Sequence, residues 1–251
     1  MNATTRGRVR LEQGAKRIRV YLGGVLVADT IAPVLVWEVP YYPAYYIPLK
    51  DVHPELLAES GNTDHSPSRG DATLLTVKAG SSEAVDAARV YRDSPIEELR
   101  DLVRFDWDAM DSWFEEDEEI YVHPRDPHTR VDILASSRHI RVEIGGVTVA
   151  ESSNARLLFE TGLPTRYYLP KTSVRMDLLE PSDTKTRCPY KGEASYHSAR
   201  IGGNPHDDIA WYYDTPLPES QKVAGLIAFY DEKVDTFVDG VLQARPKTKF
   251  A

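Results

Sequence analysis

The chain contains two copies of one sequence unit, and this duplication constrains its fold more than any other feature. Residues 18–28 return as residues 140–150, and the shift of 122 positions continues without a gap to residue 74. Twenty of the 57 positions from 18 to 74 are identical in the two copies, far more than chance gives. Near the end of each copy the shift becomes 124, which aligns Trp113 with Phe237. We therefore predict two homologous domains in tandem.

The boundary between the copies is predicted where the sequence disfavours regular structure. Residues 115–119 are consecutive acidic residues, and Pro124 and Pro127 follow closely. A block of like charge and two nearby prolines both oppose a regular element. We interpret the acidic run as a solvated boundary, and a site for a metal ion or a basic partner is the alternative. The predicted domains are residues 1–119 and 138–251, joined by a linker of residues 120–137.

Glycine pairs indicate tight hairpins in both copies. Gly23-Gly24 lies between two stretches of alternating apolar residues, and Gly145-Gly146 repeats the pattern. Type I′ turns need a positive φ at both central positions, which glycine adopts without strain. Gly202-Gly203 predicts a further hairpin. A phosphate-binding loop is the alternative for these glycines, but no lysine or helix start follows them as such a loop requires.

Short strands dominate each copy, and helix is scarce. Residues 34–38, 45–48, 74–78 and 103–106 read as strands, and the second copy repeats them. Residues 94–97 predict one short helix, because serine lies three residues before glutamate and proline suits the first helical position. Residues 174–179 predict a further turn. We expect a mainly β fold, with two homologous small β-rich domains in tandem and one or two short helices in each.

Composition excludes several classes of partner. Lys and Arg number 30 against 39 Asp and Glu, so the formal charge is −9 and nucleic acid should be repelled. No stretch reaches the roughly 18 apolar residues of a membrane span. The single cysteine, Cys188, excludes an intrachain disulfide and suits a reducing compartment. No two histidines have the i, i+4 spacing of a helical zinc site. We expect a soluble, cytoplasmic protein without a nucleic-acid, membrane or metal partner.

The second copy holds the densest polar cluster. Strand alternation from Glu193 through Ser195 to His197 would place these three side chains on one face. Tyr196 would then point to the other face. Lys191 precedes the strand and supplies a cation beside the carboxylate of Glu193. The cluster therefore joins groups suited to charge pairing, ligand binding or proton transfer.

Three interpretations of this cluster stay open. In the first, Lys191 and Glu193 form a structural ion pair. In the second, Lys191 binds a small polar or anionic molecule, Glu193 accepts a hydrogen bond and Tyr190 stacks on the ligand. In the third, Glu193 is a general acid or base, Cys188 a nucleophile and His197 a proton carrier. The cysteine nucleophile has a simple competing explanation, because a lone cysteine often serves only as a small packing residue.

The first copy keeps the charges but not their neighbours. Arg69 and Asp71 stand where the second copy has Lys191 and Glu193. The aromatic and polar neighbours are replaced: Ser66, Ser68, Leu74 and Leu75 stand in place of Cys188, Tyr190, Tyr196 and His197. We therefore expect the second domain to be the active one. Glu38 and Glu160, each next to an aromatic residue on a strand, are further candidates for a carboxylate in the site.

The motifs resemble those of a bacterial family of domains of unknown function, numbered 427. They are the Arg-Val-x-x-Gly-Gly-Val run of residues 141–152, Tyr-Tyr-x-Pro at 167–170, the Cys-Pro-Tyr-Lys-Gly segment within 176–196, and Ala-Phe-Tyr-x-x-x-Val-Asp at 228–235. The resemblance implies a compact, mainly β domain that occurs singly or in tandem. The family also carries a nucleotidyltransferase-like label, but the chain has no motif that combines Gly-Ser with paired aspartates to support it.

The sequence thus predicts a ligand site in the second domain. We expect the second domain to bind a small polar or anionic molecule. One alternative is an enzyme that uses Glu193 and Lys191 as catalytic acid–base groups in nucleotidyltransferase-like chemistry, and another is a protein-interaction module. The sequence indicates no particular cofactor. The predicted ligand-binding residues are Tyr168, Asp177, Cys188, Tyr190, Lys191, Glu193, Tyr196 and Glu160.

Overall fold

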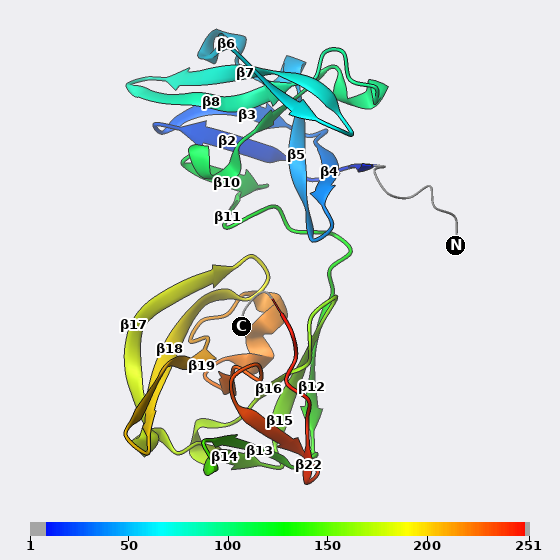
Figure 1. Ribbon diagram of the computed structural model, residues 1–251. Helices are drawn as coiled ribbons and strands as arrows, with labels where there is room; N and C mark the ends of the chain where they lie inside the picture. Colours follow the sequence, from blue (N-terminus) through cyan, green and yellow to red (C-terminus); the bar gives the residue numbers. More distant parts are fainter. Residues whose placement is uncertain (1–8, 249–251) are drawn as a thin grey trace, which may run out of the picture. The chain divides into compact units, whose positions relative to one another are not determined.

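The computed structural model describes residues 9–248 and divides the chain into two units, Met1–Asp126 and Pro127–Ala251 (Figure 1). Both units are built from antiparallel strands, which confirms the predicted mainly β class. Within residues 9–248 the only helical elements are short 3₁₀ turns. The helix predicted to begin at Ser94 is instead the turn η3 (Glu97–Leu99), which begins three residues later and has no side-chain cap. Ahead of the turn, Ser94 Oγ accepts a hydrogen bond from the Ile96 amide at 3.1 Å.

The first unit consists of two sheets. The larger has the order β1 (Arg10–Gln13), β4 (Val34–Val39), β5 (Tyr42–Pro48), β9 (Leu102–Phe105), β8 (Ser82–Val90), β7 (Gly70–Ala79), β6 (Leu57–Ser66). The smaller has the order β11 (Glu118–Ile120), β10 (Ser112–Glu115), β2 (Ile18–Leu22), β3 (Val25–Thr30). Apolar residues alternate along β2, where Ile18, Val20 and Leu22 are buried and the residues between them are not. The smaller sheet therefore presents one apolar face to a core.

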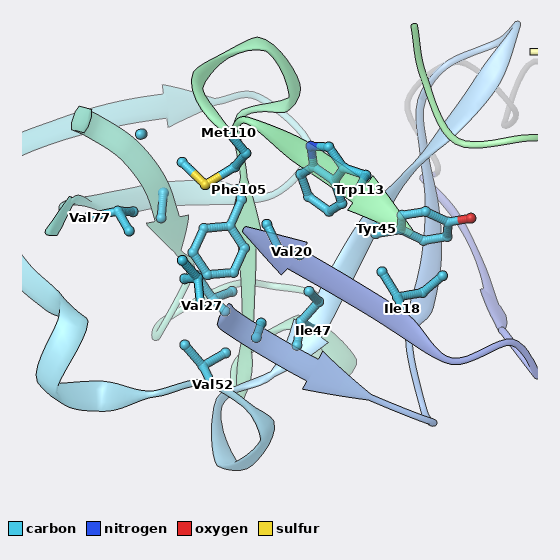
Figure 2. Packing of buried hydrophobic residues seen from close by; sticks show 14 of the residues in the cluster. Ile18, Val20, Val27, Tyr45, Ile47, Val52, Val77, Phe105, Met110 and Trp113 are labelled. Carbon is cyan, nitrogen blue, oxygen red and sulfur yellow. The ribbon is translucent and has the colours of Figure 1, made fainter. Parts of the chain in front are cut away.

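The main core of the first unit lies between these two sheets. Figure 2 shows Val20 and Val27 of the smaller sheet packed with Ile47 and Phe105 of the larger sheet. Removing one such side chain from water is worth about 1.5–3 kcal/mol. We call the side of the large sheet that faces this core the inner face. The opposite, outer face carries a second buried cluster that includes Tyr46.

The second unit repeats this arrangement strand by strand. Its counterparts of the large sheet are β12 (Val131–Ser136), β15 (Ala155–Glu160), β16 (Arg166–Tyr168), β20 (Ile227–Phe229), β19 (Asn204–Tyr212), β18 (Gly192–Ile201) and β17 (Leu179–Cys188). The smaller sheet is β14 (Val147–Ser152), β13 (Ile140–Ile144), β21 (Asp235–Val238) and β22 (Val241–Leu242). The large sheet is interrupted between β16 and β20, which are joined only by backbone hydrogen bonds of 2.8 and 2.9 Å between Leu169 and Ile227.

The junction between the copies contains more regular structure than predicted. Strand β12 lies inside the expected linker of residues 120–137 and pairs along its whole length with β15. Pro124 and Pro127 oppose a strand only up to residue 127. Beyond them, the apolar residues Val131 and Ile133 are free to join the sheet. In the described chain, β12 belongs to the second unit, whose first residue is Pro127.

The hairpin predictions are confirmed. The φ angles are 59° and 74° at Gly23-Gly24, 56° and 80° at Gly145-Gly146, and 59° and 83° at Gly202-Gly203. The irregularities of strand pairing recur as well. The register shifts at aligned positions of β2 and β13, between Val20 and Tyr21 and between Val142 and Glu143. Asp86 and Asp208, which align at the shift of 122, both adopt a positive φ. No described helix is long and apolar enough to cross a membrane.

The aligned hairpins at Gly23-Gly24 and Gly145-Gly146 differ in the space around the first glycine, which gives a testable prediction. A Cβ at Gly23 would lie 2.9 Å from the backbone oxygen of Ala79 and 2.5 Å from Ser82 Oγ, whereas nothing lies within 4 Å at Gly145. Asparagine tolerates the left-handed conformation, so the contact decides the outcome. We expect Gly23→Asn to destabilise the first unit by about 1–3 kcal/mol and Gly145→Asn to change the second by less than about 0.5 kcal/mol.

Urea unfolding followed by tryptophan fluorescence measures this difference. Trp37, Trp107 and Trp113 report on the first unit and Trp211 on the second. Equal losses in the two variants would contradict the prediction, because the two glycines have nearly the same φ.

Candidate functional site

Lys191 pairs with Glu160 rather than with the predicted Glu193. Its Nζ lies 2.5 Å from Glu160 Oε2. Lys191 lies in the turn between β17 and β18, and Glu160 is the last residue of β15. Only 12% and 9% of the two side chains are exposed. The predicted ion pair of Lys191 with Glu193 is therefore not formed, and Lys191 pairs instead with a carboxylate from a distant strand.

Glu193 lies on the other face of the sheet. It is directly opposite Arg187 in the β17–β18 ladder, with Nε and Oε2 3.3 Å apart, and its side chain is about half exposed. Successive side chains of a strand alternate between faces. Ala194 packs in the outer cluster with Leu158, so Glu193 projects from the inner face. The predicted catalytic pair Lys191 and Glu193 is therefore divided between the two faces.

A cluster of four residues recurs at matched positions in both units. We call it the matched quartet: Glu38, Tyr46, Arg69 and Tyr91 in the first unit, and Glu160, Tyr168, Lys191 and Tyr213 in the second. In the first unit Tyr46 donates to Glu38 at 2.6 Å, Arg69 Nη2 lies 3.7 Å from Glu38, and Arg69 donates to Tyr91 at 3.2 Å. Each copy thus holds one carboxylate, one cation and two tyrosines on its outer face.

Burial and charge shift the pKa values of the second quartet. Burial opposes the charged form of Lys191, but Cys188 and Glu160 outweigh it and raise the pKa of the ammonium above its usual value. Burial is the main cause of the raised pKa of Tyr168 and of Tyr213, and Glu160 adds to both shifts. The quartet therefore holds a charged lysine beside two neutral phenols at ordinary pH.

Three of the other predicted residues lie in or next to the β17–β18 hairpin, and one lies away from it in an exposed turn. Cys188 is partly exposed at the end of β17, and the buried Tyr196 bonds Thr186 Oγ1 at 2.7 Å on the outer face. The carbonyl oxygen of buried Tyr190 accepts from Ser220 Oγ at 3.3 Å. Asp177 instead lies exposed in the turn η6 (Met176–Leu178), where Arg175 holds it through a contact of 2.6 Å and lowers its pKa.

A buried ionic network on the outer face was not predicted. Arg166 contacts Asp231 at 3.1 Å and Glu232 at 2.5 Å. Burial raises the pKa of Asp231, whereas the hydrogen bonds from Arg166 and Thr248 outweigh burial and lower the pKa of Glu232 to about 2. Sequence alone could not pair residues separated by more than sixty positions, and the aligned residue of the first copy is Ala44.

Polar groups collect on the inner face of β18 and β19. Lys185 Nζ donates to Ser195 Oγ at 2.5 Å, and the ladder places both Lys185 and Tyr212 opposite Ser195. His197 stacks on Tyr212 with ring centroids 5.0 Å apart. Lys171, from the turn η5 (Lys171–Ser173), places Nζ 4.7 Å from the centroid of the same ring. We call these five residues the lysine face.

The lysine face is a property of the second copy alone. The aligned residues of the first copy are Leu49, Thr63, Thr73, Leu75 and Val90. Leu75 and Val90 are buried in the main core of that unit. The predicted alternation of Glu193, Ser195 and His197 anticipated part of this face. It missed both lysines, because their positions depend on strand register and on the turn η5.

Two features of the lysine face define its chemistry. Within residues 9–248, neither Lys171 nor Lys185 contacts a carboxylate. His197 is only 6% exposed, and its Nδ1 has no hydrogen-bond partner in the described chain. Burial, aided by the charge of Lys171, lowers the pKa of His197, although a hydrogen bond to the backbone of Glu180 acts against it. The imidazole is therefore neutral at physiological pH.

Open depressions occur elsewhere on the second unit. One is lined by Thr148, Ala150, Glu151, Thr172, Ser173, Val174 and Arg175, and the other by residues 127–132 with Glu219. Neither contains a predicted site residue. No group of three or more side chains within residues 9–248 is arranged to hold a metal ion.

Comparison with known proteins identifies one family model. It is described as a domain of unknown function (DUF427), and it matches the chain twice, over residues 10–116 and 132–240. No curated protein matches the chain.

The ion pair of the second quartet gives a stability prediction. Glu160→Gln leaves a buried lysine without its carboxylate, which should cost about 3–5 kcal/mol. The double variant Glu160→Gln/Lys191→Met should lose less than the sum of the two single changes, because the partners act as one unit. Glu193→Gln is the control, since an exposed pair contributes about 0–1 kcal/mol. Urea unfolding followed at Trp211 tests this, and additive losses would contradict the pairing.

Proposed function

The chain belongs to the DUF427 family as two tandem copies, and we propose that the second copy binds a small anionic molecule on its lysine face. The observation that carries this proposal is the pair of lysines without carboxylate partners. Lys185 contacts Ser195 and Lys171 lies over the ring of Tyr212, and neither lysine contacts an acidic group within residues 9–248.

The charge of the whole chain makes this arrangement informative. Acidic residues outnumber Lys and Arg by 39 to 30, so most cations have a carboxylate within reach. The neighbouring Arg187 illustrates this, because it pairs with Glu193. Lys171 and Lys185 carry like charges on the same face of the sheet, and like charges repel each other. A bound anion would offset that repulsion, which supports a negatively charged ligand.

The lysine face also contains polar and aromatic side chains of the kind found in ligand sites. Ser195 and His197 are buried polar side chains at 7% and 6% exposure. The partly exposed ring of Tyr212 adds an apolar surface for carbon atoms. Small-molecule sites combine apolar and aromatic surface with a few polar groups in this way.

The matched quartet supports binding rather than acid–base catalysis. The ion pair of Lys191 and Glu160 fixes the turn from which β18 begins, and β18 supplies Ser195 and His197. Glu193 is held by Arg187 on the opposite face from Lys191. The two groups of the enzyme alternative therefore do not converge on one substrate atom, so that alternative has less support. The free thiol of Cys188 suits the cytoplasmic location that we also propose.

Binding of inorganic phosphate tests the proposal. We expect Lys171→Leu and Lys185→Thr, which install the residues of the first copy, to weaken phosphate binding about tenfold each. That corresponds to the loss of one charged hydrogen bond of about 1.5 kcal/mol. Isothermal titration calorimetry at low ionic strength measures the affinity. The control is Lys247→Thr, which removes the same charge from an exposed position of the same unit.

The outcomes of this titration are distinct. Equal weakening in all three variants would indicate only a general loss of positive charge and would contradict a localised site. No binding of phosphate or of organic acids to the wild type would contradict the proposed function altogether.

A further inference from the structure

We infer that the outer edge of β17 binds an extended peptide segment that carries acidic residues at alternate positions. The peptide adds one strand to the sheet, next to residues 185–188. This partner is additional to the small anion of the proposed function, and the two share only Lys185. The inference depends on the open edge of the sheet, on its exposure and on its charge.

β17 is an edge strand. It pairs with β18 on one side, and no strand within residues 9–248 pairs with its other side. An edge strand presents a row of backbone N–H and C=O groups to which another extended chain can bond. Figure 1 shows β17 at the margin of the second unit. Addition of a peptide strand is a common mode of recognition at such an edge.

Only the second half of this edge is suited to pairing. The register of β17 shifts between Pro181 and Lys185, so the first half contains an irregularity as well as a proline. Bulges and prolines are devices that block pairing at an edge. From Lys185 onward the ladder with β18 is regular, and residues 185–187 are exposed. Residues 185–188 therefore form a regular and accessible edge segment.

The charge of this edge segment favours an acidic partner. Lys185 and Arg187 are two positions apart and project from the inner face of the sheet. Lys185 contacts no carboxylate within residues 9–248. Arg187 contacts Glu193, but a guanidinium group has five N–H donors and can bind a second carboxylate. Acidic side chains two positions apart on an added strand therefore meet both cations.

The residue between the two cations sets the rest of the pattern. Thr186 projects from the outer face, where its Oγ1 bonds the hydroxyl of Tyr196 at 2.7 Å. A β-branched residue of the partner, such as valine, suits the facing position of an added strand. The recognised sequence therefore alternates between acidic and β-branched residues.

The same charges oppose pairing between two copies of β17. Lysine on an edge strand hinders the association of like strands. Two β17 edges would bring Lys185 and Arg187 of each copy against like charges, which is unfavourable across strands. An acidic strand is the partner that this edge still admits.

The first copy provides a matched control. Its edge strand β6 has the same kind of register shift, between Glu59 and Thr63. Thr63 stands in place of Lys185, which removes the cation without a carboxylate partner. Asp64 stands in place of Thr186, which adds a carboxylate. We therefore expect β6 not to bind the acidic peptide.

Fluorescence anisotropy with a synthetic peptide tests the inference on the full chain. The probe is a labelled Ser-Glu-Val-Glu-Val-Glu-Ser peptide with blocked ends. The control peptide, Ser-Glu-Glu-Glu-Val-Val-Ser, has the same composition and charge. We expect the alternating peptide to bind about fivefold more tightly at low ionic strength, because only its carboxylates form both cross-strand charge pairs. N-Methylation of its backbone amides should abolish binding, since an added strand needs these donors.

The variant Thr186→Asp installs the residue of the first copy and separates this inference from the proposed function. Its carboxylate can still accept a hydrogen bond from Tyr196, so the sheet should be retained. We expect it to weaken the alternating peptide about threefold through like-charge repulsion. The affinity for inorganic phosphate should not change, because position 186 projects from the face opposite to the lysine face. Unchanged peptide affinity overturns the inference.

Hydrogen–deuterium exchange keeps the test valid if Thr186→Asp does not fold. In the wild type, we expect the alternating peptide to protect amides of β17, residues 179–188, and to leave those of β6, residues 57–66, unprotected. Equal protection of the two strands, or protection of neither, overturns the inference.

The remaining outcomes keep the inference and the proposed function apart. Binding of phosphate without binding of either peptide overturns the inference and leaves the proposed function standing. Equal binding of the two peptides shows only a general attraction between charges and also overturns the inference. Binding of the alternating peptide without binding of phosphate or of organic acids supports the inference and removes the proposed function.

Discussion

The ion pair between a hairpin turn and a distant strand is the constraint on which the outer face of each unit depends. Arg69 precedes β7 and Glu38 lies on β4, and three strands separate β4 from β7 in the sheet order. Neighbouring strands are about 4.8 Å apart, so a flat sheet would hold the two strands about 19 Å apart. Side chains at 3.7 Å therefore require a curled sheet. The curl of β17 and β18 is visible in Figure 1.

Such a pair is not a source of large net stability. Removing two charges from water costs about as much as their attraction returns, so hydrophobic replacements of a buried pair are often neutral. Its contribution is positional. The pair fixes the position of the hairpin turn. An ammonium group serves in the second unit (Lys191) and a guanidinium group in the first (Arg69), because the cation needs to reach only one carboxylate. The turn then holds β18 or β7 in one register, since a slip of one residue would exchange the two faces of the strand.

Local features could be predicted from the sequence, and distant pairings could not. The duplication and the glycine hairpins depend on patterns within a few residues, and both are confirmed. Alternation also placed Ser195 and His197 on one face. The partner of Lys191 depends on sheet order, which no short pattern specifies. Glu193 is the nearest carboxylate in sequence, yet a residue two positions away on a strand turns toward the other face of the sheet.

The fixed outer quartet leaves the inner face free to differ between the copies. At the aligned positions, the first unit buries Leu75 and Val90 in its main core, while the second has His197 and Tyr212. Replacing a buried leucine by a polar ring gives up apolar packing worth about 2–3 kcal/mol. It also leaves Nδ1 without a partner. A negatively charged ligand that binds only the folded second unit offsets these costs, because binding stabilises that unit by mass action. The second unit is therefore most stable when a ligand occupies its polar inner face. The apolar inner face of the first copy shows that the fold itself does not require polar residues there.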